Sequence, residues 1–516
     1  MPKFAGTQIL RHAFSTPYVF SDHSIPAPGA RDDRAAASER RTNAQTDGEP
    51  AMIAAPNIDI GHLKNDFRGQ LLTPSDPDYD AARKVFNVVI DRRPALIARC
   101  RSPEDVTQIV NLARQHGVVV SVRGTGHNVA GYAVCDDGIV IDLSLMKDIQ
   151  VDPAARTVRA GAGLTWGEVN DALQPHDLAA TGGFVSITGI GGLTLGGGLG
   201  WLVREHGLAL DNLLSAQIVL ADGRIVTASS SQNEDLFWAI RGGGGNFGVV
   251  TSFEFRVHPT GTVLAGVVLH PAKTAGDALR HWRDFEATSP DKLTQGALLF
   301  HFPDDPSGPP ELRAKPVLGM GGVYSGSVKE GEKVLGNFRS YGPPVADFFQ
   351  PMPYNQAQRM ADFLWPPGLH GYWKSSYMEK LSDAAIDVVT AHFSRVPSQH
   401  TVVVLEHNGG AMSRVPESAT AFGHRSWPFN FLVTSAWSDP SEAERNITWT
   451  REFFDAMRPF LANSSYINYI GDEGIDGLRG SYGAEKVRRL AAIKAKYDPT
   501  NFFRMNQNIA PASAAA

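Results

Sequence analysis

Cysteine is almost absent from this chain of 516 residues, which contains only Cys100 and Cys135. Two cysteines cannot form a disulfide scaffold, and their spacing does not match a clustered zinc site. The chain also lacks a block of lysine and arginine, and its formal net charge is −6. We therefore expect no metal, and no electrostatic reason for nucleic acid or an anionic membrane as a partner.

The sequence also lacks an apolar run suited to a membrane span. Its longest stretch without charge, residues 178–203, contains nine glycines together with threonine and serine. A spanning helix needs about 20 predominantly apolar residues, so this stretch is expected to form buried loops and turns. The N-terminal residues show neither the apolar core nor the cleavage site of a signal peptide. We expect a cytoplasmic enzyme.

The overall composition is that of a globular protein. Hydrophobic residues make up 42% of the chain and charged residues 20%, which excludes a wholly disordered protein. The length predicts two to four domains with a sizeable core. Residues 1–55 differ, because the polar segment 26–50 has almost no large apolar side chains. We expect residues 1–55 to be a disordered tail.

Residues 91–259 alternate between helix and strand patterns. A helix is predicted over 103–116, with Ser102 as its N-cap and Gly117 at its end. Thr165 and Glu168 form a capping box for a second helix, and Asp222-Gly223 predicts a hairpin turn. This rhythm is typical of a mixed fold of helices and strands.

The residue composition and the secondary-structure pattern change beyond residue 260. Aromatic residues become denser up to about residue 463, and β-type runs such as 400–407 alternate with helical patches. This favours a second domain with its own sheet. Near the C-terminus, a basic helix is predicted to stop at Asp498-Pro499.

Glycine is the one excess, with 51 residues, and many of them fall in three loops. In the first, 123–131, Gly124 and Gly126 follow a predicted strand, so the loop could direct backbone N–H groups at a phosphate or be an ordinary turn. His127 in this loop could be a structural histidine, a cofactor ligand or a nucleophile that bonds a cofactor.

The glycine content of the second and third loops also calls for an explanation. Residues 182–202 interleave glycine with Ile, Leu, Val and Trp, which is not typical of a flexible linker and indicates close approach of the backbone to a flat ligand. Residues 243–248 match the pattern G-x-G-x-x-G, but a strand follows instead of a helix. The dinucleotide fingerprint must open a helix, so we reject an NAD site.

The three loops, in this order, resemble the flavin domain of the vanillyl-alcohol oxidase / para-cresol methylhydroxylase (PCMH) superfamily, and within it the bacterial berberine bridge enzyme-like branch. The resemblance covers the chain after the tail. It is carried by residues 123–128, 188–202, 235–255, 466–469 and 497–509. It implies an α+β fold in which a two-part PCMH-type FAD-binding domain (60–260 with the C-terminal segment 460–512) meets a separate α+β substrate domain with its own antiparallel sheet (261–459).

The resemblance implies FAD as the cofactor, bonded covalently through His127. Several members add a second bond from a cysteine, but Val185 stands at that position here, so a single link is expected. Cys135 lies elsewhere and is expected to be a buried free thiol. By resemblance, the residues that would bind the cofactor are Arg123, Gly124, Thr125, Gly126, Asn128, Thr188, Gly189, Gly192, Gly197, Gly248, Val250, Asn506 and Asn508.

By the same resemblance, the catalytic candidates are Tyr466, Tyr469 and Glu406. A tyrosine needs assistance to take a proton near neutral pH, whereas a carboxylate needs desolvation to raise its pKa. Glu406 could also be an ordinary exposed carboxylate of a strand. Tyr372 and Lys374 look substrate-side by resemblance, although an aromatic core stripe would explain them as well.

The function implied is that of an FAD-dependent oxidase. Hydride would leave a carbon that bears a hydroxyl or amine on a small organic substrate, and O₂ would reoxidise the flavin to give H₂O₂. Two alternatives stay open, which are oxidative cyclisation in secondary metabolism and a flavin-binding protein without catalysis. The expected partners are the small-molecule substrate and O₂, and the chain is expected to be a monomer or a homodimer.

Overall fold

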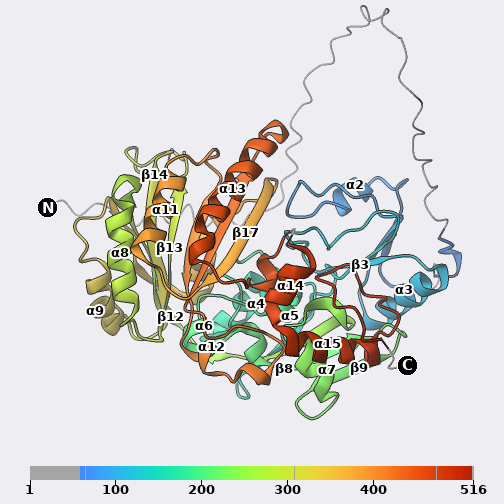
Figure 1. Ribbon diagram of the computed structural model, residues 1–516. Helices are drawn as coiled ribbons and strands as arrows, with labels where there is room; N and C mark the ends of the chain where they lie inside the picture. Colours follow the sequence, from blue (N-terminus) through green and yellow to red (C-terminus); the bar gives the residue numbers. More distant parts are fainter. Residues whose placement is uncertain (1–57, 64–65, 307, 472, 514–516) are drawn as a thin grey trace, which may run out of the picture.

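A computed structural model describes residues 58–513 except 64–65, 307 and 472. The predicted tail, 1–55, lies outside the described residues. The described chain forms an assembly of smaller sheets and helices beside one large sheet that is covered by helices on one face (Figure 1). None of the helices in this part of the chain is both long and apolar enough to cross a bilayer.

Two sheets form the first half of the protein. Their strands are β1 Gln70–Leu72, β2 Leu96–Arg99, β3 Val120–Arg123, β4 Ile139–Asp142, β5 Ile149–Asp152, β6 Thr157–Gly161, β8 Leu213–Val219, β9 Ile225–Ser229 and β10 Val249–Arg256. The first sheet has the order β1-β2-β4-β3, with β2, β4 and β3 parallel. The second, β5-β6-β10-β8-β9, is antiparallel. A short ladder pairs β7 Leu178–Ala179 with β11 His258–Pro259.

The large sheet is antiparallel throughout. Its strands are β12 Thr262–Pro271, β13 Leu293–His301, β14 Pro316–Tyr324, β15 Ala346–Asp347, β16 Gln350–Pro353, β17 His370–Met378, β18 Val402–His407 and β19 Phe429–Trp437. They follow the order β15-β12-β14-β13-β18-β19-β17, with β16 also beside β12. One face is covered by helices α8 Ala275–Glu286, α9 Val328–Phe338, α11 Asp383–Phe393 and α13 Ala443–Met457 (Figure 1). The opposite face of the sheet is not covered by these helices and is therefore available to contact the first half of the protein.

The remaining helices belong mainly to the first half and to the C-terminus. They are α2 Tyr79–Ala82, α3 Pro103–His116, α4 Trp166–Leu173, α5 Ile190–Gly196, α6 Val203–His206, α7 Glu234–Ile240, α10 Tyr354–Ala357, α12 Ala411–Arg414, α14 Gly474–Tyr482 and α15 Ala484–Tyr497. The C-terminal helix α15 returns to pack beside α7 (Figure 1). The two ends of the described chain thus contribute to one body.

The local predictions hold where the sequence signals were strong. Ser102 accepts a hydrogen bond from Asp105 N at the start of α3, and Gly117 ends the helix in the left-handed conformation. Thr165 and Glu168 form the expected capping box of α4. The turn at residues 222–223 joins the antiparallel strands β8 and β9. The third glycine loop leads into strand β10, as predicted.

Two large hydrophobic cores stabilise the protein. One joins buried side chains of residues 63–257 to those of 466–509, and the other lies between the large sheet and its four helices. Met412, Ala421 and Phe422 pack in the first core, although they fall in the predicted substrate domain, 261–459. The segment between β18 and β19 therefore leaves the large sheet and attaches to the first half.

Candidate active site

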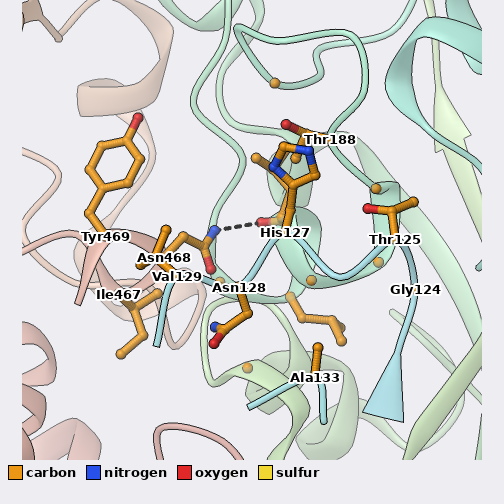
Figure 2. A pocket seen from close by; sticks show the side chains of 18 of the residues that line it. Gly124, Thr125, His127, Asn128, Val129, Ala133, Thr188, Ile467, Asn468 and Tyr469 are labelled. Atoms are coloured by element: carbon orange, nitrogen blue, oxygen red, sulfur yellow. Dashed lines mark hydrogen bonds between the residues drawn. The ribbon is translucent and has the colours of Figure 1, made fainter. Parts of the chain in front are cut away.

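A cavity of about 330 Å³ lies between the glycine loops of the first half and the uncovered face of the large sheet. It is lined by residues from the first half, from the large sheet and from the C-terminal segment. Figure 2 shows Thr125, His127 and Thr188 on one side of this pocket and Tyr469 on another. The cavity is within the usual size range of a small-molecule site.

The glycine side of the cavity is a wall of main chain. Glycines from all three loops line it, and at Gly192 and Gly245 an added Cβ would meet no atom within 4 Å. Substituents at these positions would thus have open space in front of them. Asn506 completes this side, with its Nδ2 donating to Gly245 O (3.1 Å) while its Oδ1 has no partner among the described residues. These features fit a flat ligand that packs on the backbone and offers a hydrogen-bond donor to Asn506.

His127 is held at the edge of this wall by an aromatic neighbour. Its ring stacks on Phe86, with centroids 4.2 Å apart and an interplanar angle of 19°. The Phe86 N–H donates to Gly126 O (3.1 Å), which ties the stacking residue to the loop that carries the histidine. Burial lowers the pKa of His127 to about 4. The imidazole is therefore neutral at neutral pH and keeps a nitrogen lone pair that can act as a nucleophile.

Glu406 stands on the opposite side, on strand β18. Its carboxylate accepts one hydrogen bond from Asn430 Nδ2 (2.7 Å) and one from the Tyr469 hydroxyl (2.8 Å). The residue is 6% exposed, and this burial raises its pKa to about 7 although both hydrogen bonds act in the opposite direction. Near neutral pH the carboxyl group can therefore either take up or release a proton.

Tyr466 and Tyr469 meet edge to face, with centroids 4.8 Å apart. The Tyr466 oxygen accepts hydrogen bonds from Gly198 N (2.8 Å) and Asn468 Nδ2 (2.7 Å), yet burial raises its pKa to about 12. Burial raises the pKa of Tyr469 well above its ordinary value, and its hydroxyl donates to Glu406. Both tyrosines are thus neutral hydroxyls at neutral pH.

Comparison with known proteins places this geometry in a family. Residues 94–229 match the family model of an FAD binding domain, and residues 465–510 match that of berberine and berberine-like proteins. An FAD-linked oxidoreductase of Bacillus subtilis is 31% identical over 460 residues, which cover 87% of this chain and 98% of that protein. The chain belongs to the berberine bridge enzyme-like FAD-linked oxidoreductases.

Two further comparisons agree with this assignment. (R)-6-hydroxynicotine oxidase of Paenarthrobacter nicotinovorans is 30% identical over 458 residues, or 86% of this chain and 97% of that protein. The crystal structure of 6-hydroxy-D-nicotine oxidase from Arthrobacter nicotinovorans superposes with a TM-score of 0.79 at 28% identity, covering 86% of this chain and 98% of that one. The expected α+β fold of a PCMH-type oxidoreductase that binds FAD is therefore confirmed.

Most site residues predicted for this berberine bridge enzyme-like chain line the cavity. Their roles remain predictions, but their positions are compatible with those roles. The predicted residues that line it are Gly124, Thr125, Gly126, His127, Asn128, Thr188, Gly189, Gly192, Gly248, Val250, Glu406, Tyr466, Tyr469 and Asn506.

Arg123 is not among the residues that line the cavity, and its role in cofactor binding stays a prediction. Its guanidinium forms a buried ion pair with Asp142 and donates to the carbonyl oxygens of Ala82 and Lys84. The charge of this strand residue is thus already paired inside the protein. Arg123 instead fixes the start of the His127 loop.

Gly197 and Asn508 also lie outside the cavity lining. Gly197 has φ +150°, and a Cβ there would come within 2.7 Å of Tyr466 Cε2, so the glycine is needed for the close approach of this tyrosine. Asn508 lies two residues beyond Asn506, in the segment that leads to Ile509, whose N–H donates to Asn246 Oδ1 (2.9 Å). Gly197 thus supports the site from behind, and the cofactor-binding roles of Gly197 and Asn508 stay predictions.

The large sheet corrects one further expectation. Trp373 lines the cavity, whereas its neighbours Tyr372 and Lys374 do not. Adjacent side chains of strand β17 point to opposite faces, and Lys374 pairs with Glu473 (3.0 Å) on the face away from the cavity. The alternation of residues 370–378 was the signal that could have identified Trp373.

The positions of Val185 and Cys135 agree with those expected from the sequence. Val185 lines the cavity and offers no nucleophile. Cys135 is buried and free, outside the cavity lining, with its thiol 3.5 Å from Ser121 Oγ. Burial raises the pKa of this thiol, which keeps it protonated and unreactive.

Two residues that support the site were not found from the sequence. Phe86 stacks on His127, and Asn430 holds the carboxylate of Glu406. Neither lies in a glycine loop or a recognisable motif. Asn430 is directly opposite Glu406 in the ladder between β18 and β19, a pairing that only the register reveals.

Proposed function

We propose that this FAD-linked oxidoreductase is an oxidase that acts on a carbon bearing a hydroxyl or amine group in a small organic substrate. The observation that carries the proposal is the buried Glu406 carboxylate, which faces the glycine wall across the cavity and has a pKa of about 7. A base with this pKa is matched to proton removal near neutral pH. FAD, when bound, accepts the hydride from the carbon and delivers its electrons to O₂ with release of H₂O₂.

The residues of the glycine side would hold the cofactor. Thr125, Asn128 and Thr188 offer polar side chains along the wall, and Asn506 offers a free acceptor oxygen. The neutral imidazole of His127 would supply the single covalent attachment, because stacking on Phe86 restricts its orientation. Val185 leaves no second attachment on this wall.

Glu406 is favoured over both tyrosines as the base. Tyr466, with a pKa of about 12, would release its own proton too rarely at neutral pH to take one from a substrate. Tyr469 directs its hydroxyl hydrogen at Glu406 Oε1 and so orients the carboxylate. Tyr466 and Tyr469 thus act as positioning residues for the substrate and for Glu406.

Covalent attachment is tested on a denaturing gel viewed for flavin fluorescence. The parent protein is expected to show a fluorescent band, and His127→Ala is expected to lose it. Cys135→Ala serves as the control and should keep the band, since its thiol lies outside the cavity. A parent protein that is yellow but releases all of its flavin would contradict the covalent link, and a colourless protein would contradict the oxidase proposal itself.

Substitution of Tyr469 by phenylalanine should shift the pH dependence of flavin reduction. The hydroxyl of Tyr469 stabilises the charged form of Glu406, so its loss should raise the pKa of that carboxyl above about 7. Because the base acts when deprotonated, the rise of the reduction rate should move to higher pH. Anaerobic rates measured across a pH series would show the shift, and an unchanged profile would argue against coupling of the two groups.

A further inference from the structure

The sheet side of the cavity is built in two rows of side chains that differ in chemistry. Leu298, Val404 and Leu432 lie directly opposite one another on the adjacent strands β13, β18 and β19. Gly296, Glu406 and Asn430 form the neighbouring row, two residues along each strand. Residues two apart on a strand point to the same face and are separated by about 7 Å. The row of Leu298, Val404 and Leu432, called the aliphatic floor below, therefore lies about the width of one aromatic ring from the Glu406 carboxylate.

Aromatic side chains surround this floor. Trp365 and Trp373 line the cavity and pack with the aliphatic row, and Trp373 meets Tyr469 edge to face at 6.2 Å. Phe184 and Trp201 contribute two more rings to the lining and contact each other edge to face at 4.9 Å. Walls of this kind favour flat rings, since aromatic pairs gain energy beyond the burial of area.

Most polar atoms near these walls are already engaged, although the buried Nε2 of Gln295 has no partner among the described residues. The Trp365 indole N–H donates to Thr434 Oγ1 (3.0 Å), and that of Trp201 donates to Phe184 O (3.0 Å). Gln295 borders the cavity, but its side chain accepts a hydrogen bond from Trp282 Nε1 (3.2 Å) in the core on the other face of the sheet. On this side of the cavity, Glu406 and Tyr469 thus form the main polar centre that the described side chains offer a substrate, beside the indole N–H of Trp373.

We infer that the substrate is a flat, largely apolar ring compound whose reacting hydroxyl or amine is its main polar group, and that it is not a sugar. The inference rests on the proposed function, since it places the reacting group at Glu406. A ring on Leu298, Val404 and Leu432 directs a substituent at the carboxylate, and Gly296 leaves the space beside it free of a side chain. A sugar would bury several hydroxyls without partners, at about 1–3 kcal/mol each.

Binding to the holoenzyme tests this inference separately from turnover. A panel of benzyl, naphthyl and indolyl alcohols and amines is titrated under anaerobic conditions, with glucose and xylobiose as sugar probes. Heat of binding and bleaching of the flavin band are recorded for each compound. We expect binding by members of the ring panel, no measurable binding of the sugars, and an affinity about tenfold weaker in Trp373→Leu. Tyr372→Phe is the matched control, because this neighbour on β17 lies outside the cavity lining, and it should leave the affinity unchanged.

Each outcome has a defined meaning. Ring compounds that bind in a Trp373-dependent manner without bleaching the flavin would support the ligand class and contradict the oxidase proposal. Sugars that bind and bleach the flavin would support the oxidase and overturn the ligand class. The inference would also be overturned if no ring compound bound, or if Trp373→Leu kept the affinity of the parent.

Discussion

Replacing Glu406 by glutamine is expected to lower the rate of anaerobic flavin reduction by about 10²- to 10⁴-fold, the usual contribution of a general base. Glutamine has nearly the same size and can still accept the hydrogen bond of Asn430, so the cavity should keep its shape. Unlike the carboxylate, the glutamine amide cannot accept a proton from the substrate. The substrate hydroxyl or amine would then have to release its proton without assistance while hydride leaves the adjacent carbon.

The pH dependence distinguishes this role from simple damage to the site. In the parent enzyme the reduction rate should rise with pH through about 7, as the carboxyl group of Glu406 loses its proton. In Glu406→Gln the reduction rate should be low and should no longer rise with pH. Glu254→Gln is a suitable control, since this carboxylate lies on β10 outside the cavity lining. A variant at Glu406 with the rate and pH profile of the parent would exclude the residue as the base.

Lys494→Met is expected to lower the free energy of unfolding by about 3–5 kcal/mol. Lys494 is fully buried, and its ammonium donates to Asp498 Oδ2 (2.6 Å), Asn246 O (2.6 Å) and Phe503 O (2.9 Å). Methionine would fill a similar volume but leave the buried Asp498 without its cation. The loss of one partner of a buried pair leaves an uncompensated charge, which is the costly case.

A lysine two residues away provides the control for this experiment. Lys496 on the same helix pairs with Asp235 (2.7 Å), but the lysine side chain is 60% exposed and that of Asp235 is 35% exposed. Lys496→Met should therefore change the free energy of unfolding by only about 0–1 kcal/mol. Chemical denaturation of both variants, followed by circular dichroism, would test the contrast. Equal effects of the two substitutions would show that burial of the pair is not what matters.

The sequence alone predicted the local structure well, and many residues that it named for cofactor binding lie in the cavity lining. Caps, turns and glycine loops are encoded in neighbouring residues, which is why Ser102, the turn at 222–223 and the glycines around His127 were found. The family resemblance supplied the assembly of these pieces into an FAD-binding fold. The type of chemistry could thus be predicted before the structure.

The sequence could not predict contacts that depend on strand register or on packing between distant segments. The pairing of Asn430 with Glu406 and the burial of Arg123 against Asp142 both arise between strands. An arginine in a glycine loop has the residue type expected of a phosphate ligand, and only the position of Asp142 shows that its charge is used. Trp373 was missed for a related reason, since one residue of offset in β17 exchanges the two faces.

The way in which the C-terminal segment holds the third glycine loop sets an order of events during biosynthesis. Asn246 in this loop donates to Gln507 O (3.1 Å) and accepts from Ile509 N, and Asn506 donates to Gly245 O. These partners are synthesised about half a chain later than the loop that they hold. A nascent chain still lacking residues 494–509 thus carries the histidine and its wall without the segment that closes them. Flavin loading is therefore expected to be a late event that follows synthesis of this segment, and maturation should be sensitive to any fusion or truncation that delays its docking.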